Sequence, residues 1–416
     1  MQRMNIVVYW EQDSWGGVDS QLLTLLRTWP APGDRFTIIY NRGNPGLARI
    51  RDALTALPNV QLVETVSFSY NEIVRRLVRL PAGRWLRLAF YPLQPLLLWW
   101  MTGRLAAVLR RHGPFDVVLA DNGGYPAAWG AQSAVLAARR AGVPARFLLV
   151  HHAATRPAMF MQWYERLVDR AVSKAVSAII CVSHATRRTL FECRAFNDET
   201  TRLRVIHNGI AVLPATGNTP PCNLRATVGA GAALLVGIVG RIEPYKGHED
   251  LIFALARLDT AERARLHLVV LGSGAPKELA RLRRLADKCG VGDAVHFPGY
   301  VAGEPVDLIA QFDLLVIATR SFEGYGLTLA EAMHAGTPIL STRVGAVPEF
   351  VDENNGALVN PGSPLEMALA LRDFLANRPA WQARAAHAQQ RIRSDGNRMA
   401  DEYHHLFAEC LAEQPD

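Results

Sequence analysis

The sequence predicts an α/β protein with two domains, each built on a parallel sheet. Apolar runs of strand length alternate with helix-length amphipathic segments along the 416 residues. Continuously apolar strands separated by helices are typical of parallel sheets that helices cover on both faces. One segment, 211–231, breaks this alternation with three prolines and three glycines. It predicts a connection between two domains.

The elements of the first domain follow in order. Its strands are expected at 5–9, 36–40, 60–63, 116–120, 146–150, 178–182 and 203–206. Amphipathic stretches between them predict helices, for example at 21–28, 125–140 and 164–175. Because helices join successive strands, the strands are expected to run parallel.

The second domain repeats the pattern after the connection. Its strands are expected at 234–239, 266–271, 294–297, 314–318 and 338–341. Ser363, Pro364 and Glu366 have the pattern of a capping box that opens a helix. The last segment has an apolar stripe at helical spacing, which needs a surface to pack on. The stripe consists of Met399, Tyr403, Leu406, Phe407 and Cys410. The expected domains are 1–212 and 233–395, with 213–232 as the linker and 396–416 as a C-terminal helix.

Composition excludes several classes of protein. Hydrophobic residues make up 50% and charged residues 20% of the chain, which excludes a disordered or fibrous protein. The five cysteines are scattered without a C-x-x-C pair, so we expect a reducing compartment and no disulfide framework. The N-terminal residues lack the pattern of a secretory signal. The longest uncharged stretch, 88–103, contains two prolines and is too short to span a bilayer. We therefore expect a cytoplasmic protein without a transmembrane helix.

Charge is unevenly distributed between the two halves. Residues 1–230 contain 27 basic and 14 acidic residues, whereas residues 231–416 contain 18 and 24. No acidic residue lies between Glu72 and Asp116, and arginines from Arg75 to Arg111 surround a run rich in leucine and tryptophan. This composition fits docking on the inner face of an anionic membrane, and it fits equally a solvated arginine face over a core helix. A nucleic-acid partner is not expected, because no recognised binding motif is present and the second half is acidic.

Two loops of the second domain carry candidate binding residues. The first follows the strand at 234–239 and contains Gly240, Arg241 and Lys246 before a helix from residue 248. Lys246 is one of only four lysines, and both cations can point at one diphosphate. The second follows the strand at 314–318 and places Glu323 in a glycine-rich loop and Glu331 about a turn into the next helix. Helix amides between them suit phosphate or sugar oxygens, although Glu331 could instead support the helix dipole.

These motifs resemble a known family. Gly240-Arg241 with Lys246-Gly247, the segment 323–338 (E-G-Y-G-L-T-L-A-E-A-M-H-A-G-T-P) and the segment 345–349 (G-A-V-P-E) are similar to the signature of group 1 glycosyltransferases. These are retaining enzymes of glycosyltransferase family 4. The resemblance implies a GT-B fold: two Rossmann-like, doubly wound parallel-sheet domains that face a central cleft, with the C-terminal helix returning to the first domain. It is strong over 234–360 and weaker over the rest.

The resemblance also implies residue roles. Arg241 and Lys246 would hold the donor diphosphate, Glu323 the sugar hydroxyls and Glu331 the ribose. The implied donor site also includes Gly240, Gly324, Gly326, Leu327 and Thr328 on the side of the sugar and phosphates. Tyr300 and Val301 would lie near the nucleobase. In the first domain it implies a glycine loop at Gly16 and Gly17 and a histidine near the transferred sugar. That histidine is His151 or His152, and spacing leaves both open.

The implied activity is retaining sugar transfer from a nucleotide-sugar to a glycan or lipid-linked acceptor in envelope or exopolysaccharide synthesis. A soluble acceptor, a non-catalytic GT-B scaffold or binding subunit, and a sugar-nucleotide epimerase remain alternatives. No two aspartates stand two positions apart, so the D-x-D metal motif of the other large glycosyltransferase fold is missing. We therefore expect a hexosyltransferase that needs no metal and no cofactor.

Overall fold

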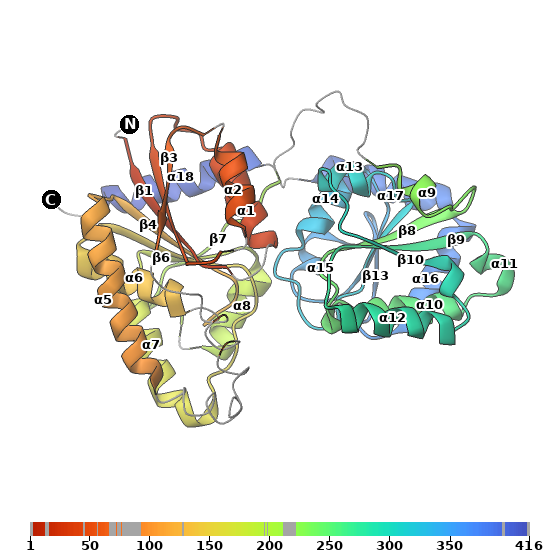
Figure 1. Ribbon diagram of the computed structural model, residues 1–416, viewed down its shortest axis with the longest axis horizontal. Helices are drawn as coiled ribbons and strands as arrows, with labels where there is room; N and C mark the ends of the chain where they lie inside the picture. The colour runs from red at the N-terminus through yellow and green to blue at the C-terminus, as the bar shows by residue number, and fades with distance from the viewer. Residues whose placement is uncertain are drawn as a thin grey trace. The chain divides into compact units, whose positions relative to one another are not determined.

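In a computed structural model of residues 1–416, the chain forms two compact units (Figure 1). Unit 1 comprises Met1–Ala211 and Asp395–Asp416, and unit 2 comprises Val212–Ser394. The structure describes residues 3–12, 16–44, 46–55, 57–65, 72, 76, 93–126, 129–194, 196–197, 199–210, 222–392 and 396–413. Most of the arginine-rich segment before residue 93, and the predicted linker up to residue 221, lie outside the described residues.

Unit 1 contains a seven-stranded parallel sheet in the order β3-β2-β1-β4-β5-β6-β7. The strands are β1 Asn5–Trp10, β2 Arg35–Tyr40, β3 Val60–Glu64, β4 Val117–Asn122, β5 Ala145–Val150, β6 Ala178–Cys181 and β7 Leu203–Val205. All seven predicted strands are confirmed, each to within two residues at its ends. The order reverses between β1 and β4. In doubly wound sheets the connections diverge at this point, and ligands bind beyond the strand ends there.

Helices cover both faces of this sheet. They are α1 Gly17–Arg27, α2 Leu47–Leu54, α5 Gln94–His112, α6 Trp129–Ala141, α7 Gln162–Ser173, α8 His184–Cys193 and α18 Gly396–Ala412, with a short 3₁₀ turn η2 at Met159–Met161. On one face α5, α6 and α7 (Figure 1) contribute to the hydrophobic core that also contains Val7 and Tyr9 of β1. On the other, Phe407 of α18 stacks on Phe147 of β5 with ring centroids 4.6 Å apart. The C-terminal helix therefore returns to the first unit, as expected.

One predicted helix start was wrong. The segment 125–140 was expected to be helical throughout, but α6 begins at Trp129. Tyr125 instead forms a parallel bridge with Ala154. Its buried hydroxyl donates to Asp169 at 2.8 Å, so a long-range contact fixes Tyr125 outside the helix.

Unit 2 contains a six-stranded parallel sheet in the order β10-β9-β8-β11-β12-β13. The strands are β8 Leu234–Val239, β9 Leu266–Leu271, β10 Val295–Gly299, β11 Leu314–Ile317, β12 Ile339–Thr342 and β13 Ala357–Val359. The five predicted strands are confirmed. The sequence missed β13, an edge strand of three residues that is too short to show a period. The order reverses between β8 and β11.

The helices of unit 2 form a layer on each face of its sheet (Figure 1). They are α9 Leu224–Thr227, α10 His248–Ala256, α11 Thr260–Arg263, α12 Pro276–Lys288, α13 Pro305–Ile309, α14 Leu327–Ala335, α15 Val347–Phe350, α16 Pro364–Ala376 and α17 Arg378–Arg391, with 3₁₀ turns η3 Pro244–Lys246 and η4 Gly292–Ala294. Helices α10, α12 and α16 pack on one face and α13 and α14 on the other. No helix in the described ranges is long and apolar enough to cross a bilayer.

The predicted capping box at the start of α16 is only half correct. The Ser363 hydroxyl accepts from the Glu366 amide at 3.3 Å, as expected. The Glu366 carboxylate, however, accepts from the backbone and side-chain amides of Asn360, at 2.7 and 2.9 Å. It therefore fixes the preceding turn instead of capping the amide of Ser363.

Candidate functional site

The candidate site of unit 2 lies where the strand order reverses. Strands β8 and β11 are neighbours in the sheet, and the two loops singled out from the sequence leave their carboxyl ends. The first loop runs from Gly240 through η3 to Gly247, and the second from Ala318 to Gly326. Adjacent loops at such a point form the usual ligand-binding edge of an open parallel sheet.

An ion pair joins the two loops. Lys246 Nζ lies 2.8 Å from Glu323 Oε2, and both side chains are partly exposed, at 25% and 16%. The Thr319 hydroxyl donates to the same carboxylate oxygen at 3.2 Å. The structure therefore brings together a cation and a carboxylate that are 77 positions apart in the chain. Because both side chains are partly exposed, a ligand could form hydrogen bonds or ion pairs with each of them.

Arg241 lies in the same loop but has a different partner. Its guanidinium is half exposed and lies 3.2 Å from Glu243 Oε1. Tyr245 is affected by both cations: burial raises the pKa of the Tyr245 hydroxyl, while the charges of Lys246 and Arg241 act to lower it. Both cations thus act electrostatically on one tyrosine, and the Arg241 side chain is exposed to solvent.

Backbone contacts hold the two loops together. The Arg320 amide donates to the Tyr245 carbonyl at 2.7 Å. Gly247, with φ +72°, approaches the end of β11 so closely that an added Cβ would lie 1.9 Å from the Ala318 carbonyl oxygen. Only glycine fits there. On the far side of the second loop, the Ala346 amide donates to the Glu323 carbonyl at 2.8 Å. The predicted G-A-V-P-E segment therefore supports the loop of Glu323.

The N-terminus of α14 offers free amides. Gly326 is the N-cap with φ +85°, a left-handed conformation that favours glycine. In the part of the chain that the structure describes, the amides of Leu327 and Thr328 have no recorded acceptor, whereas those of Leu329 and Ala330 bond back to Gly326. Unpaired amides at a helix start, with the positive end of the dipole, attract anions.

Glu331 lies one turn further along α14. It is beyond the first turn, so the structure does not favour the helix-dipole role that the sequence left open. No hydrogen bond or ion pair is recorded for its carboxylate among the described residues. Burial, with a smaller contribution from the charge of Glu304, raises its pKa to about 7. A largely buried carboxylate for which no donor is recorded is suited to accept hydrogen bonds from ligand hydroxyls.

The remaining residues of the implied donor site also follow the carboxyl ends of strands. Gly240 follows β8, and Tyr300 and Val301 follow β10. The Tyr300 side chain is 63% exposed. Gly324 is buried in the second loop.

The sequence analysis missed two supports of this site. One is Thr319, which contacts Glu323. The other is a charge network in which Arg320 donates to Asp250 at 2.6 Å and lies 2.6 Å from Glu249 on α10. In the sequence, the acidic pair Glu249 and Asp250 could have indicated this network. Acidic residues in the first turn of a helix also stabilise the helix dipole, so the pair had a second explanation.

Unit 1 carries a second polar cluster at the carboxyl ends of the neighbouring strands β4 and β5. His151 follows β5, and its Nε2 lies 2.9 Å from Asp121 Oδ1 on β4, with both side chains buried. Because a carboxylate accepts hydrogen bonds, Nε2 of His151 is the donor in this contact. His152, by contrast, is exposed. Asp121 was missed from the sequence, although an acid at the end of an apolar strand is a usable signal.

The glycine loop of unit 1 is held by Asp19. Its buried carboxylate accepts from the Gly16 amide at 2.6 Å and from the Trp10 indole at 2.8 Å. Burial raises the pKa of Asp19 to about 7 in spite of these donors. Gly16 precedes α1 and Gly17 is its first residue, so Asp19 fixes the start of the helix.

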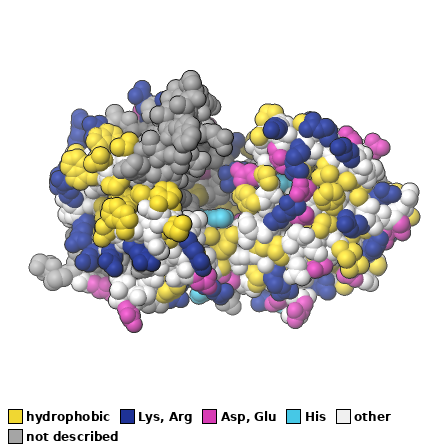
Figure 2. Space-filling model, turned by 90° about the horizontal axis from the view of Figure 1, so that it is seen from below, with side chains coloured by type: hydrophobic (Ala, Val, Ile, Leu, Met, Phe, Trp, Pro, Cys, Tyr) yellow, Lys and Arg dark blue, Asp and Glu magenta, His cyan; other side chains and the backbone are white. Residues whose placement is uncertain are grey.

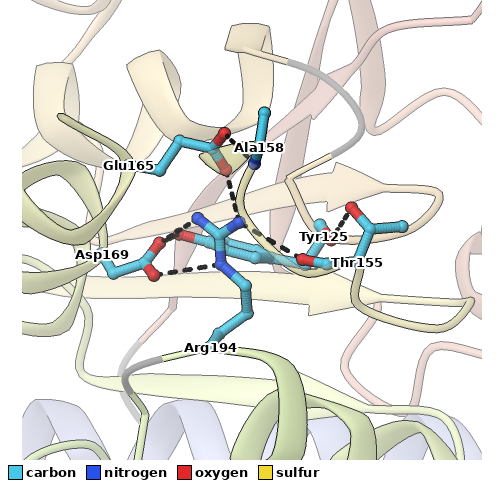
Figure 3. Close-up of polar contacts among 6 residues, drawn as sticks. All are labelled: Tyr125, Thr155, Ala158, Glu165, Asp169 and Arg194. Atoms are coloured by element: carbon cyan, nitrogen blue, oxygen red, sulfur yellow. Dashed lines mark hydrogen bonds and ion pairs between the residues drawn. The ribbon is translucent and has the colours of Figure 1, made fainter. Parts of the chain in front are cut away.

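A buried arginine fixes the segment that follows the two histidines (Figure 3). The Arg194 side chain is fully buried and pairs with Asp169 at 2.7 Å and with Glu165 at 2.5 Å, both on α7. It also donates to the Thr155 carbonyl and lies over the Tyr125 ring, 5.1 Å from the centroid. The Glu165 carboxylate accepts from the Ala158 amide at 3.2 Å. One side chain thereby joins α7, α8 and the loop after β5.

Family sequence models match both units. The description "Glycosyltransferase Family 4" matches residues 15–212, and "Glycosyl transferases group 1" matches residues 229–393. Together they cover strands β2 to β13 and both candidate loops of unit 2. The chain belongs to the group 1 glycosyltransferases of family 4 type.

Among its relatives, this glycosyltransferase family member is 35% identical over 210 residues to the D-inositol 3-phosphate glycosyltransferase of Streptomyces avermitilis. The match covers 48% of this chain and 44% of that relative, so the chain spans less than half of the relative's length. Two solved structures share its GT-B fold. HepE of Anabaena, in complex with UDP and glucose, has a TM-score of 0.75 at 20% identity, covering 99% of this chain and 100% of that one. WaaG, a glycosyltransferase involved in lipopolysaccharide biosynthesis, has a TM-score of 0.66 at 19% identity, covering 95% and 99%.

Proposed function

We propose that the protein is a retaining hexosyltransferase that moves a sugar from a nucleotide-sugar donor to a glycan or lipid-linked acceptor. The observation that carries the proposal is the accessible Lys246–Glu323 pair beside the free amides of α14. The cation and the helix amides match the diphosphate of a nucleotide-sugar, and the carboxylate of Glu323 matches its sugar hydroxyls. HepE, which shares the fold, was solved with UDP and glucose.

In this mechanism the bond between the anomeric carbon and the diphosphate breaks while the acceptor hydroxyl attacks from the same face. The acceptor proton passes to the departing phosphate oxygen. Negative charge builds on the diphosphate, and Lys246, Arg241 and the amides of Leu327 and Thr328 stabilise it. Preorganised charges of this kind often supply the largest part of a catalytic effect. The cations and amides take the role that a metal ion has elsewhere, so the proposed reaction needs no metal and no cofactor.

The remaining donor contacts follow the family pattern. Glu323 accepts from the sugar hydroxyls, Glu331 from the ribose, and Tyr300 and Val301 lie beside the base. In unit 1 we assign the sugar contact to His151, because its ring is fixed by Asp121 whereas His152 is exposed. Gly16 and Gly17 complete the donor contacts.

The test is a panel of nucleotide-sugars, scored first by thermal stabilisation of the protein and then by transfer. A donor that binds only the folded protein raises the melting temperature in proportion to its affinity. We expect one nucleotide-sugar to stabilise the protein and to yield a product with the donor's anomeric configuration. Stabilisation without transfer to any glycan or lipid-linked acceptor would indicate a binding protein in place of an enzyme. A product with the inverted anomeric configuration would contradict the retaining mechanism.

The state of Glu331 leads to a pH prediction. With a pKa of about 7 in the free protein, its carboxyl is mostly protonated at pH 6 and mostly ionised at pH 8. Two ribose hydroxyls bind the ionised form better, so UDP binding should weaken as pH falls below about 7, approaching tenfold per unit. Glu331→Gln should bind UDP more weakly and lose this part of the dependence. Calorimetry of UDP binding to the original protein and to Glu331→Gln, from pH 5.5 to 8.5, separates the contribution of Glu331 from that of the UDP phosphate, which titrates in both experiments. If the affinity for UDP changed with pH in the same way in both proteins, the assignment of Glu331 to the ribose would be contradicted.

The Asp121–His151 pair leads to a second prediction. His151→Ala should reduce kcat/KM strongly, and His152→Ala, its neighbour and matched control, should leave it near the original value. Asp121→Asn should lie between them, with a loss of about ten- to a hundredfold, because a hydrogen bond to a charged group is weakened. Kinetics with a saturating acceptor measure all three. A larger loss in His152→Ala than in His151→Ala would reverse the assignment.

We place the acceptor in envelope or exopolysaccharide synthesis, where lipid-linked glycans are extended at the cytoplasmic face of the membrane. The fold is shared with WaaG, and the first 230 residues carry the excess of basic charge. The Arg75 to Arg111 region remains part of this proposal as a surface for peripheral membrane contact. Its described arginines, Arg76, Arg104, Arg110 and Arg111, are exposed.

A further inference from the structure

Unit 1 exposes large apolar side chains outside the Arg75 to Arg111 region. On η2 and α7, Met159, Phe160, Trp163 and Leu167 are between 53% and 91% exposed. We call these four residues the α7 surface. They lie within nine positions of one another. Soluble monomeric proteins rarely expose several large apolar side chains so close together, and such groups mark interaction surfaces.

The charge around the α7 surface has one sign. Within residues 155–174 the exposed ionisable side chains are Arg156, Arg166, Arg170 and Lys174. The two acids of α7, Glu165 and Asp169, are turned inward onto Arg194 (Figure 3). The buried arginine therefore removes the negative charge of this helix from its outer face and leaves the face basic and apolar.

Helix α5 extends the same composition. Its N-terminal half exposes Leu96, Trp99 and Trp100, and Arg104 lies 5.8 Å from the centroid of the Trp100 ring. Helices α5, α6 and α7 form one layer of unit 1 (Figure 1). Figure 2 shows hydrophobic side chains gathered with Lys and Arg on this face of unit 1. The exposed acids of the chain lie elsewhere than on the described parts of α5 and α7.

We propose that the α7 surface docks on an anionic lipid bilayer. Tryptophan, phenylalanine and methionine insert into the headgroup boundary, and arginines beside them pair with lipid phosphates. A protein partner or a second copy would require complementary acids, and this face offers only basic groups to a second copy of itself. The proposal extends the membrane contact inferred above and assigns it to residues outside the arginine-rich region.

The test uses vesicle flotation of the full-length protein. We expect it to float with phosphatidylcholine vesicles that contain about 30% phosphatidylglycerol, to float weakly with phosphatidylcholine alone, and to release as salt rises. The triple variant Met159→Ser, Phe160→Ser, Trp163→Ser should bind at least about fivefold less. Arg166→Glu with Arg170→Glu should lose the preference for anionic lipid. The matched control is Leu365→Ser with Leu369→Ser, two exposed leucines of α16 that are 58% and 53% exposed, and it should float like the original protein.

Three outcomes would overturn the inference: no flotation of the original protein at low salt, equal flotation of the triple variant, or sedimentation of the original protein as a dimer that the triple variant dissociates. Thermal melting of each variant confirms that the fold is retained. Flotation needs no sugar transfer, and transfer to a soluble acceptor needs no vesicle. Failure of the membrane proposal and failure of the proposed activity are therefore distinguishable.

Discussion

Replacing Lys246 by alanine should lower kcat for sugar transfer by about 10²–10³-fold, the loss usual when one preorganised stabilising group is removed. The ammonium lies 2.8 Å from Glu323 Oε2, and in the proposed mechanism it binds a diphosphate oxygen of the donor. In the proposed mechanism its charge matters most when negative charge builds on the departing diphosphate. The effect should therefore fall mainly on kcat, with a smaller change in KM.

The control for Lys246 is Lys277→Ala, since Lys277 is an exposed lysine of the same unit on α12. It should retain the original kcat. Thermal melting of the Lys246 variant should remain close to that of the original protein, because the pair is partly exposed and such pairs contribute little to stability. A Lys246 variant that is folded and transfers sugar within about twofold of the original rate would remove Lys246 from the mechanism.

Replacing Arg194 by methionine should reduce the free energy of unfolding of unit 1 by about 3–5 kcal/mol, the range for breaking one partner of a buried ion pair. The side chain is fully buried, and so is that of Asp169. Methionine fills similar space but leaves the Asp169 carboxylate charged and without its cation. The loop after β5, which Arg194 joins through the Thr155 carbonyl, should exchange its amide hydrogens faster.

Two further variants sharpen this test. Asp169→Asn combined with Arg194→Met should recover part of the loss, because it removes the uncompensated charge. Arg398→Met breaks the half-exposed pair with Glu402 on α18 of the same unit and should change stability by less than about 1 kcal/mol. Urea unfolding midpoints combined with hydrogen exchange measure all three. Equal midpoints for Arg194→Met and Arg398→Met would show that the network contributes no more than a surface pair.

Local pattern in the sequence determined the fold class and most strands. Apolar runs such as 234–239 and 266–271 coincide with β8 and β9, since a buried parallel strand is apolar at every position and its length is set locally. The local pattern was insufficient for β13, which is too short to show a period, and for Tyr125, which a hydroxyl contact with Asp169 holds outside α6. The motifs that resemble the family also identified the two loops, because glycines and charges at fixed spacing are visible in one dimension.

Only the tertiary structure decided which charges meet. The pairing of Lys246 with Glu323, the burial of His151 against Asp121, the raised pKa of Glu331 and the inward turn of the α7 acids onto Arg194 all depend on residues tens of positions apart or on burial by other elements. Charge interactions and desolvation act through space and depend on the local exclusion of water, whereas the sequence records only neighbours along the chain. The sequence thus determined which residue types stand at the strand ends, and folding determined their partners and their protonation.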